Sequence, residues 1–368
     1  MPQPQNSGDM TTRRLLIKSG QTDYEVEFRD DLAEVTNLLK ATPKAVLVVD
    51  KNVARLYSTQ LSALTGSLPT FVVPATEEEK TLDGVAQVLT FLQQQDCNKQ
   101  SMIIAVGGGI IQDIVAFAAH VYYRGLKWYF VPSTLLSMAD SCIGAKSSIN
   151  FNGFKNQLGA FHSPARVFIC DQFVRTLSDD DVGSGYGEIF KLFLIGSREL
   201  FARLKTVLAR DGFRNSSLPE FIYESLRVKQ AIIEQDEYET GLRRILNYGH
   251  TFGHALEGLT HYEVPHGLAV AWGLDLVNWL AYRAGLLSKA DFDDIHAFAA
   301  RYFSRRISRA VTAAELIQAT RRDKKVADGK ISLALLERPG ALKIVPTAYD
   351  ATLEASVSDY LNHYNILS

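Results

Sequence analysis

The histidines of this chain indicate possible chemistry most directly, because two of them have the spacing of one helix face. His250 and His254 are four residues apart in NYGHTFGHALEG, so a helix would place them on one face. His266 follows Pro265 at the start of another helical pattern, and Glu188 lies in the apolar stretch GSGYGEIFKLF, where an unpaired carboxylate would be costly. A histidine pair alone is more often a surface or packing feature. With a third ligand and a carboxylate it indicates a metal site, and three protein ligands would leave a Zn²⁺ position open for a substrate hydroxyl.

A set of cationic and amide side chains runs through the same parts of the sequence. Taken singly, each cation is more often a solvated charge or half of a local ion pair. Taken together with a metal site and a nucleotide fold, the set favours a small polyanionic sugar phosphate over a neutral alcohol. The candidates are Arg124 in YYRG, Lys146 in DSCIGAKSSIN, Lys155 and Asn156 in FKNQLGAF, Lys191, Lys229 and Arg243.

The elements that must position these residues differ between the two halves of the chain. In the first half, apolar runs typical of buried parallel strands alternate with helical stretches, which predicts an open nucleotide-binding α/β sheet. These runs are AVLVV at 45–49, PTFVVP at 69–74, SMIIAV at 101–106 and WYFVP at 128–132. From about residue 172 helical patterns dominate, over 218–234, 243–258 and 266–285, followed by a hairpin that joins 331–336 to 341–345.

Two features of the predicted sheet favour a nucleotide. Gly107, Gly108 and Gly109 lie between a predicted strand and a predicted helix, where a backbone without Cβ atoms and a helix N-terminus suit a diphosphate. Asp50 directly follows the 45–49 strand, where a carboxylate can bind a ribose. The alternative for the glycines is a tight connection, which we rank slightly below phosphate binding, and the alternative for Asp50 is a cap on the next helix.

Composition limits the class of protein. The 368 residues include 39 Lys and Arg against 41 Asp and Glu, so no broad basic surface for nucleic acid or an anionic membrane is expected. No apolar run is long enough to span a bilayer, and the polar N-terminus lacks an apolar signal segment. The three cysteines have no metal or disulfide spacing. We therefore expect a cytoplasmic protein with no membrane and no nucleic-acid partner.

The motifs GGGIIQD, YYRG, PSTLLSMADSCIGAKSSIN, KNQLGAF, GEIFK, GLRRILNYGHTFGH, PHG and DKKVADGK occur in this order between about residues 50 and 330. With them the chain resembles the dehydroquinate synthases, within the superfamily of sugar phosphate cyclases. The polar opening of the chain predicts a flexible tail at 1–12. The resemblance implies a Rossmann-like NAD-binding α/β domain at 13–171 and a mainly helical zinc- and substrate-binding domain at 172–368. It also implies a homodimer in which the partner's Arg124 reaches the substrate.

The resemblance also assigns roles to individual residues. It implies metal ligation by Glu188, His250 and His266, with Zn²⁺ or Co²⁺ as the ion, and gives His254 to the substrate phosphate. The implied NAD contacts are Asp50, Asn52, Glu77, Lys80, Gly108, Gly109, Asp113, Ser133, Thr134, Lys155 and Thr176. The implied catalytic residues are Asp140, Lys146, Lys191, Lys229, Asn247 and His254. The implied substrate contacts are Arg124, Lys146, Asn156, Lys229, Arg243, Asn247, His254 and Lys325, with Lys324 an open alternative to Lys325.

The reaction that the resemblance implies converts 3-deoxy-D-arabino-heptulosonate 7-phosphate into 3-dehydroquinate and phosphate, with NAD used catalytically, in the shikimate pathway of aromatic amino acid biosynthesis. Lys146, Asn156 and Arg243 suit the substrate carboxylate. Related cyclases acting on sedoheptulose 7-phosphate or glucose 6-phosphate replace His254 or Asn247, and this chain keeps both. A sedoheptulose 7-phosphate cyclase of secondary metabolism is the alternative, and a polyol dehydrogenase ranks third. A purely binding or scaffold role would not need metal ligands, a glycine turn and anion donors together.

The chain also departs from the family pattern at several positions. Gln112 stands where a glycine is common, His162 stands where a tyrosine is frequent, and GAKSSIN replaces GGKTAVN. Leu268 replaces the glutamate of HGEAVA close to His266, so it could change the surroundings of the metal. None of these positions is a proposed metal ligand.

Overall fold

The computed structural model describes residues 13–321, 326–327 and 329–367. The chain divides into two compact units, Met1–Leu177 and Ser178–Ser368. The predicted boundary falls at residue 171, at the start of the short 3₁₀ helix Asp171–Thr176. In the structure this segment is tied to the first unit, because Tyr57 Oη donates to the carbonyl of Gln172 at 2.9 Å. The tail at 1–12 and the lysine pair 324–325 lie outside the described residues.

The first unit is built on a seven-stranded sheet with the order β1-β2-β9-β6-β5-β3-β4. Every pairing is parallel except that of β1 with β2. Its strands are β1 (Arg14–Ile17), β2 (Tyr24–Phe28), β3 (Ala45–Asp50), β4 (Thr70–Val73), β5 (Met102–Gly107), β6 (Lys127–Pro132) and β9 (Arg166–Ile169). The four predicted apolar runs coincide with β3 to β6, and the predicted Rossmann-like α/β architecture is confirmed.

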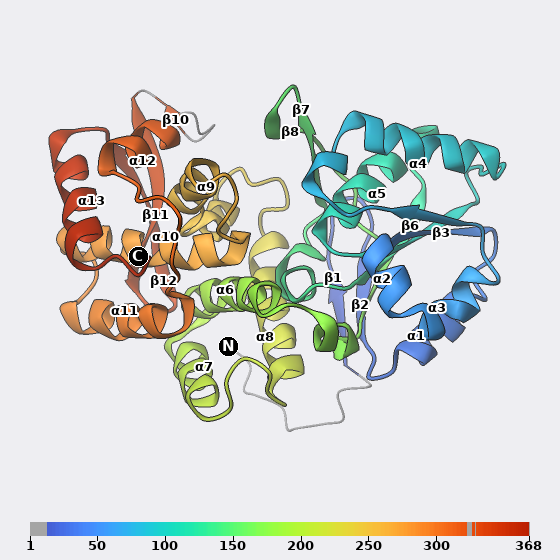
Figure 1. Ribbon diagram of the computed structural model, residues 1–368, viewed down its shortest axis with the longest axis horizontal. Coiled ribbons are helices and arrows are strands. Elements are labelled where there is room, and N and C mark those ends of the chain that lie inside the picture. Colours follow the sequence, from blue (N-terminus) through green and yellow to red (C-terminus); the bar gives the residue numbers. More distant parts are fainter. Residues whose placement is uncertain (1–12, 322–325, 328, 368) are drawn as a thin grey trace. The chain divides into compact units, whose positions relative to one another are not determined.

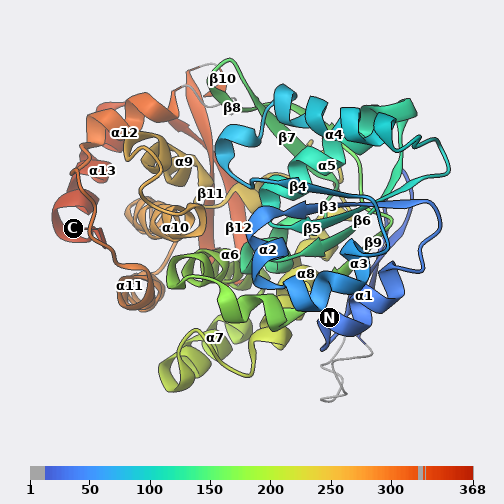
Figure 2. The same ribbon diagram turned by 45° about the vertical axis from the view of Figure 1, so that its right-hand side comes forward.

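Helices cover both faces of this sheet, as Figures 1 and 2 show. On one face lie α4 (Leu82–Gln94) and α5 (Gly109–Val121), and on the other α1 (Leu32–Leu39) and α3 (Ser58–Thr65), while the short α2 (Lys51–Leu56) follows β3. An antiparallel hairpin of β7 (Lys146–Phe151) and β8 (Phe154–Phe161) contacts α5. This hairpin was not predicted from the sequence.

Short helices carry several candidate residues of the first unit. Three of them are 3₁₀ turns, at Glu77–Glu79, Tyr122–Arg124 and Asp171–Thr176. The fourth, Ser137–Ser141, is a π-helix. Single π turns occur often at functional sites.

The second unit is mainly helical, as predicted. Its helices are α6 (Asp179–Gly196), α7 (Arg198–Asp211), α8 (Leu218–Ile233), α9 (His250–Leu259), α10 (His266–Arg283), α11 (Lys289–Phe303), α12 (Ala313–Thr320) and α13 (Ala351–His363). A three-stranded antiparallel sheet of β10 (Val326–Ala327), β11 (Lys330–Arg338) and β12 (Ala341–Ala348) contains the predicted hairpin. Helix α10 lies at the centre of the unit, in contact with α6, α9, α11, α13 and β11 (Figure 2).

Glycines allow α6, α9 and α10 to approach one another very closely. A Cβ atom on Gly187 would lie 2.0 Å from the carbonyl oxygen of Gly267, and one on Gly273 would lie 2.1 Å from that of Gly249. Only glycine fits where two helix backbones touch in this way. The close crossing of α6 with α10 brings Glu188 next to His266.

One predicted helix is wrong in its first part. The pattern at 243–258 is not continuous, because a 3₁₀ turn over Leu242–Asn247 ends before Gly249, and α9 begins only at His250. Gly249 has φ +78°, a left-handed conformation that glycine adopts at little cost. A hydrophobic period of 3.6 residues cannot reveal a single residue of this kind. None of the described helices is both long and apolar enough to cross a membrane.

Candidate active site

The second unit brings the predicted metal ligands into one cluster. His250, His254 and His266 offer nitrogen atoms that all lie within 4.8 Å of one another. Glu188 Oε1 is 3.6 Å from Nε2 of His250 and 3.4 Å from Nε2 of His266. His250 and His266 are the first residues of α9 and α10, and Glu188 lies within α6. Three imidazoles and a carboxylate form a donor set that fits Zn²⁺ or Co²⁺.

The other ring nitrogen of His250 and of His266, the two predicted metal ligands among the histidines, also has a contact. His266 Nδ1 lies 3.2 Å from Glu257 Oε2, and His250 Nδ1 lies 3.2 Å from the carbonyl oxygen of Tyr248. Such contacts fix the ring orientation and leave Nε2 for a metal. Leu268 supplies no carboxylate here, and its side chain lies near Gly183. The carboxylate that contacts Nδ1 of His266 comes from Glu257 on the neighbouring helix α9.

Protonation of His266 reflects its two acidic neighbours. Burial lowers the pKa of His266, but hydrogen bonds to Glu188 and Glu257 outweigh burial and raise that pKa to about 10. A metal ion that binds Nε2 of His266 has to displace this proton. The same carboxylates that hold the proton therefore provide the negative charge that a divalent ion needs.

A buried lysine accompanies the cluster. Lys191 Nζ lies 2.5 Å from Glu188 Oε2, one helical turn along α6. Glu188 and Lys191 are only 1% and 2% exposed. Two charges this far from water are stable only as partners. Lys191 therefore offers an ammonium proton at the edge of the candidate metal site.

Further predicted substrate residues lie on elements that adjoin α6. Lys229 is a buried residue of α8, and Arg243 is a buried residue of the 3₁₀ turn Leu242–Asn247. Both elements contact α6. Asn247, in the same turn, donates through Nδ2 to Glu239 Oε1.

Asp236 organises the loop that leads to Arg243. Its carboxylate accepts backbone N–H groups from Thr240 and Gly241 at 2.8 Å each and from Arg243 at 2.9 Å. Burial raises the pKa of Asp236, but these backbone hydrogen bonds together lower it to about 2. A carboxylate with several N–H donors strongly favours its ionised form.

The glycine turn of the first unit fits a dinucleotide. Gly109 begins α5, and no side chain caps this helix N-terminus. A Cβ on Gly109 would meet nothing within 4 Å, whereas one on Gly108 would lie 2.8 Å from Thr134 Cγ2 and one on Gly107 would lie 2.4 Å from Ile111 Cγ1. Gly107 and Gly108 thus permit close packing. Gly109 leaves open space beside free helix N–H groups, which suits a diphosphate.

Lys80 connects several predicted NAD contacts to a predicted substrate contact. Its Nζ lies 3.1 Å from Asp113 Oδ2 and donates to Asn156 Oδ1 at 2.8 Å. Glu77 Oε1 lies 3.8 Å from Lys80 Nζ and 3.5 Å from Lys155 Nζ. Burial raises the pKa of the Asp113 carboxyl, against the opposing effect of Lys80. The structure therefore gathers these residues around one lysine.

The remaining predicted NAD contacts already have structural roles. Asp50 caps α2 by accepting from the N–H groups of Asn52 at 2.6 Å and Val53 at 3.3 Å, so the capping alternative is what the structure shows. Thr176 Oγ1 lies 2.9 Å from Tyr57 Oη. The backbone N–H of Ser133 donates to Gly107, and Thr134 Oγ1 lies 2.8 Å from the hydroxyl of Ser137. Ribose or nicotinamide contacts from these residues stay predictions.

Gln112 fixes the π-helix that carries Asp140. Gln112 Nε2 donates to the carbonyl of Ser141 at 2.6 Å, and the hydroxyl of Ser141 donates to Gln112 Oε1 at 2.7 Å. Gln112 is 6% exposed and Asp140 is 9% exposed. Gln112, at a position where the family commonly has glycine, therefore adds two hydrogen bonds between α5 and the π-helix.

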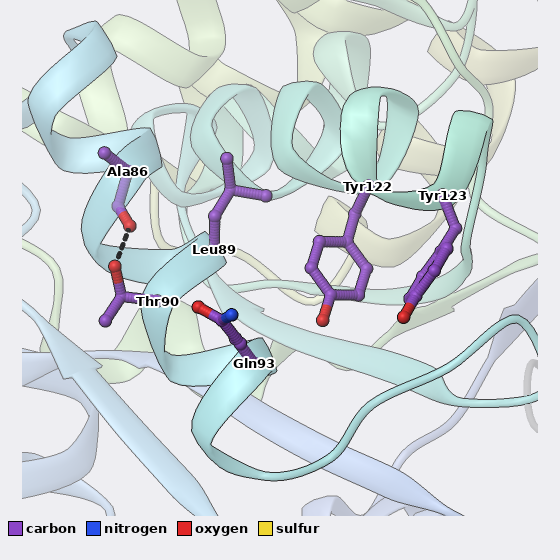
Figure 3. Close-up of a pocket in the computed structure, with 6 residues that line it drawn as sticks. All are labelled: Ala86, Leu89, Thr90, Gln93, Tyr122 and Tyr123. Atoms are coloured by element: carbon purple, nitrogen blue, oxygen red, sulfur yellow. Dashed lines mark hydrogen bonds between the residues drawn. The ribbon is translucent and has the colours of Figure 1, made fainter.

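Arg124 and Lys146 are exposed. Arg124 has φ +64° and follows Tyr123, which with Tyr122 lines a surface pocket against α4 (Figure 3). Thr90 in this pocket donates to the carbonyl of Ala86 at 2.8 Å. The pocket contains none of the predicted site residues.

Sequence reasoning missed residues that hold the candidates in place, chiefly Glu257, Tyr248, Asp236, Glu239 and Asn150. Glu257 carried a usable signal, since it lies three residues after His254 in GHALE and so shares a helix face with it. Tyr248 acts through a backbone carbonyl, which side-chain identity cannot reveal.

Comparisons with known proteins agree with this arrangement. The sequence profile of the 3-dehydroquinate synthase N-terminal domain matches residues 70–184, and that of the 3-dehydroquinate synthase C-terminal domain matches residues 185–326. A 3-dehydroquinate synthase of Streptococcus pyogenes serotype M3 is 34% identical over 334 residues, covering 89% of this chain and 93% of the relative.

Two solved structures share the fold. The 2-epi-5-epi-valiolone synthase ValA from Streptomyces hygroscopicus subsp. jinggangensis, with NAD⁺ and Zn²⁺ bound, is 26% identical with a TM-score of 0.83, over 94% of this chain and 98% of ValA. A 2-deoxy-scyllo-inosose synthase complexed with carbaglucose-6-phosphate, NAD⁺ and Co²⁺ is 21% identical with a TM-score of 0.84, over 96% of this chain and all of that one. The resemblance read from the motifs is thereby confirmed: the chain belongs to the 3-dehydroquinate synthase family.

Proposed function

We propose that this chain is a 3-dehydroquinate synthase, which converts 3-deoxy-D-arabino-heptulosonate 7-phosphate into 3-dehydroquinate and phosphate in aromatic amino acid biosynthesis. The main observation behind this proposal is the cluster of Glu188, His250, His254 and His266. It combines three residues that could bind a metal with a further histidine beside them. The 34% identity to a curated 3-dehydroquinate synthase supports the same reaction.

Glu188, His250 and His266 would hold a divalent metal, and residues around Gly109 and Lys80 would hold NAD. When bound, the metal polarises substrate hydroxyls and NAD accepts and later returns a hydride. The donor sets fit both groups, as the cluster of imidazoles and the open space at Gly109 indicate. ValA is bound to the same two kinds of group.

The chain's own residues would then bind and orient the substrate. Arg243 and Asn156 donate to its carboxylate, since a guanidinium and an amide both match carboxylate oxygens. His254 and Asn247 donate to the phosphate, which leaves once the neighbouring carbon has lost its proton. Lys191, whose Nζ forms an ion pair with Glu188 Oε2 at 2.5 Å, would hold a proton beside the substrate hydroxyls.

We further propose a homodimer in which the partner's Arg124 completes the phosphate site. Arg124 is exposed and lies in a turn with φ +64°, so it is available to a second copy. Light scattering should give twice the 40.9 kDa chain mass. Arg124→Ala should raise KM for the phosphorylated substrate while the dimer persists.

Phosphate release tests the function directly. Purified protein with Zn²⁺ and NAD receives either 3-deoxy-D-arabino-heptulosonate 7-phosphate or sedoheptulose 7-phosphate, each with and without a chelator. Chelator-sensitive release from the first alone supports the proposal. Release from the second alone would instead identify a cyclase like ValA and would contradict the carboxylate contacts of Arg243 and Asn156.

A further inference from the structure

Asn150 lies opposite an irregularity of the β7–β8 hairpin that includes two binding candidates. The strand pairing joins Ile149 to Leu158 and Phe151 to Phe154, with a register shift between these two pairs. Asn150 therefore faces a bulge that contains Lys155 and Asn156. Bulges beside functional sites re-aim side chains, and here both re-aimed residues are predicted to bind ligands.

The side chain of Asn150 spans from this bulge to the segment that precedes α4. Its Oδ1 accepts the backbone N–H of Asn156 at 3.0 Å, and its Nδ2 donates to Glu77 Oε1 at 2.8 Å and to the Glu77 carbonyl at 3.3 Å. The backbone N–H of Asn150 donates to the carbonyl of Lys80 at 2.7 Å. One residue thus contacts two predicted NAD residues and one predicted substrate residue.

Asn156 needs such support because of its backbone. Its φ is +56°, in the left-handed region that non-glycine residues rarely adopt. Its Oδ1 accepts from Lys80 Nζ and from the hydroxyl of Ser148, each at 2.8 Å. Lysine and hydroxyl donors occupy the oxygen, so the amide N–H groups of Asn156 are left for a carboxylate.

We propose that Asn150 is a positioning residue, which holds the bulge so that Asn156 presents its amide donors to the substrate carboxylate while Glu77 and Lys80 face the cofactor. This inference rests on the proposed function for the identity of the substrate. The structural part of the inference, that Asn150 holds the backbone of Asn156, does not depend on the proposed function.

The first test compares Asn150→Ser with Asn152→Gly. Asn152 lies at the tip of the same hairpin with φ +50°, which glycine tolerates, and its side chain enters none of the contacts above. Asn150→Ser should raise KM for the heptulosonate phosphate about tenfold, roughly the effect of losing one hydrogen bond, with kcat changed less than about twofold. Equal KM values for Asn150→Ser and Asn152→Gly would overturn the inference. So would a fall in kcat at unchanged KM.

The second test exchanges the donor and the acceptor of the hydrogen bond from Asn150 Nδ2 to Glu77 Oε1. Asn150→Asp keeps an acceptor for the N–H of Asn156 but places a carboxylate next to that of Glu77. Because the two carboxylates repel each other, the substitution should displace Glu77 and weaken NAD binding. In a Glu77→Gln background the glutamine amide can donate to the new carboxylate, and Asn150→Asp should then weaken NAD binding several-fold less. An equal loss in both backgrounds would count against the inference.

Hydrogen exchange separates this inference from the proposed function. In ligand-free protein, the amide of Asn156 should exchange at least about tenfold faster in Asn150→Ser than in the wild type and in Asn152→Gly. Unchanged protection would refute the positioning role whatever the substrate is. If the wild type releases no phosphate from the heptulosonate, the proposed function fails, and faster exchange at Asn156 still supports the hold by Asn150.

Discussion

Glu257 Oε2 lies 3.2 Å from Nδ1 of His266, the ring nitrogen opposite the one that approaches Glu188 at 3.4 Å. The imidazole is therefore held between two carboxylates. A carboxylate on the far nitrogen of a ligand histidine orients the ring and increases its basicity.

Glu257→Gln should weaken zinc binding about 10- to 100-fold, because the amide orients His266 without the negative charge. Competition with a chromophoric chelator measures this affinity without any assay of activity. Glu263→Gln is the matched control, since the carboxylate of Glu263 contacts Ser308 rather than a ligand histidine. Equal zinc affinity in the two variants would show that Glu257 does not act on the metal.

Lys191→Met should destabilise the metal-free protein by about 3–5 kcal/mol, because Glu188 loses a buried partner 2.5 Å away. Bound zinc would take over part of the charge of Glu188. Zinc should therefore raise the free energy of unfolding of the variant more than that of the wild type. Urea unfolding with chelator and with zinc gives both increments, and identical increments would exclude this compensation.

The sequence predicted β3 to β6, because strands buried in a parallel sheet form short apolar runs, but it did not predict β1, β2 and β9. The motifs grouped Glu188 with His250 and His266 although Glu188 is far from them in sequence, and the structure places the three side chains together. Their role as metal ligands stays a prediction. The close approach at Gly187 and Gly267 that brings them together depends on two helix backbones meeting. Periodicity along one helix carries no information on that contact.

Other parts of the site could not be predicted, for different reasons. The hairpin of Asn150 contains a bulge, so its side chains do not alternate regularly between apolar and polar. Asp236 binds backbone N–H groups, and nothing in its own sequence context distinguishes it from a surface aspartate. The hydrogen bonding of Gln112 could not be predicted, because its partner Ser141 lies in a different element.

Asp236→Asn should destabilise the protein by about 1–2 kcal/mol near neutral pH, as loss of a helix cap does, because an amide cannot accept all three backbone N–H groups. The pKa of Asp236 is about 2, below its usual 3.8, so the ionised form stabilises the fold above that usual value. This stabilisation is lost as pH falls through the folded-state pKa. The difference from wild type should therefore shrink between pH values of about 4 and 2.

Urea midpoints at a series of pH values measure this trend. Asp293→Asn, a surface change at an aspartate paired with Lys289, is the control. A difference between Asp236→Asn and wild type that stays constant down to the lowest pH would mean that the charge of Asp236 is not what stabilises the loop.

Substitutions of Gln112 and Ser141 should have coupled effects on the free energy of unfolding. Gln112→Met and Ser141→Ala each remove at least one of the two hydrogen bonds, which measure 2.6 and 2.7 Å. A double-mutant cycle on the free energy of unfolding should give a coupling of about 1 kcal/mol. Additive effects would mean that the paired contact does not tie α5 to the π-helix.

Gly107 and Gly109 should respond to alanine in opposite ways, although they stand two residues apart. A Cβ at Gly107 would lie 2.4 Å from Ile111 Cγ1, so Gly107→Ala should destabilise the fold. A Cβ at Gly109 would meet nothing within 4 Å, so Gly109→Ala should unfold at the same or a slightly higher urea concentration, since alanine favours helix. That methyl group would nevertheless fill the space where the cofactor diphosphate approaches the start of α5. Calorimetric titration should therefore show NAD affinity at least about tenfold weaker in Gly109→Ala, a loss of roughly 1.4 kcal/mol or more, whereas unchanged affinity would place the diphosphate elsewhere.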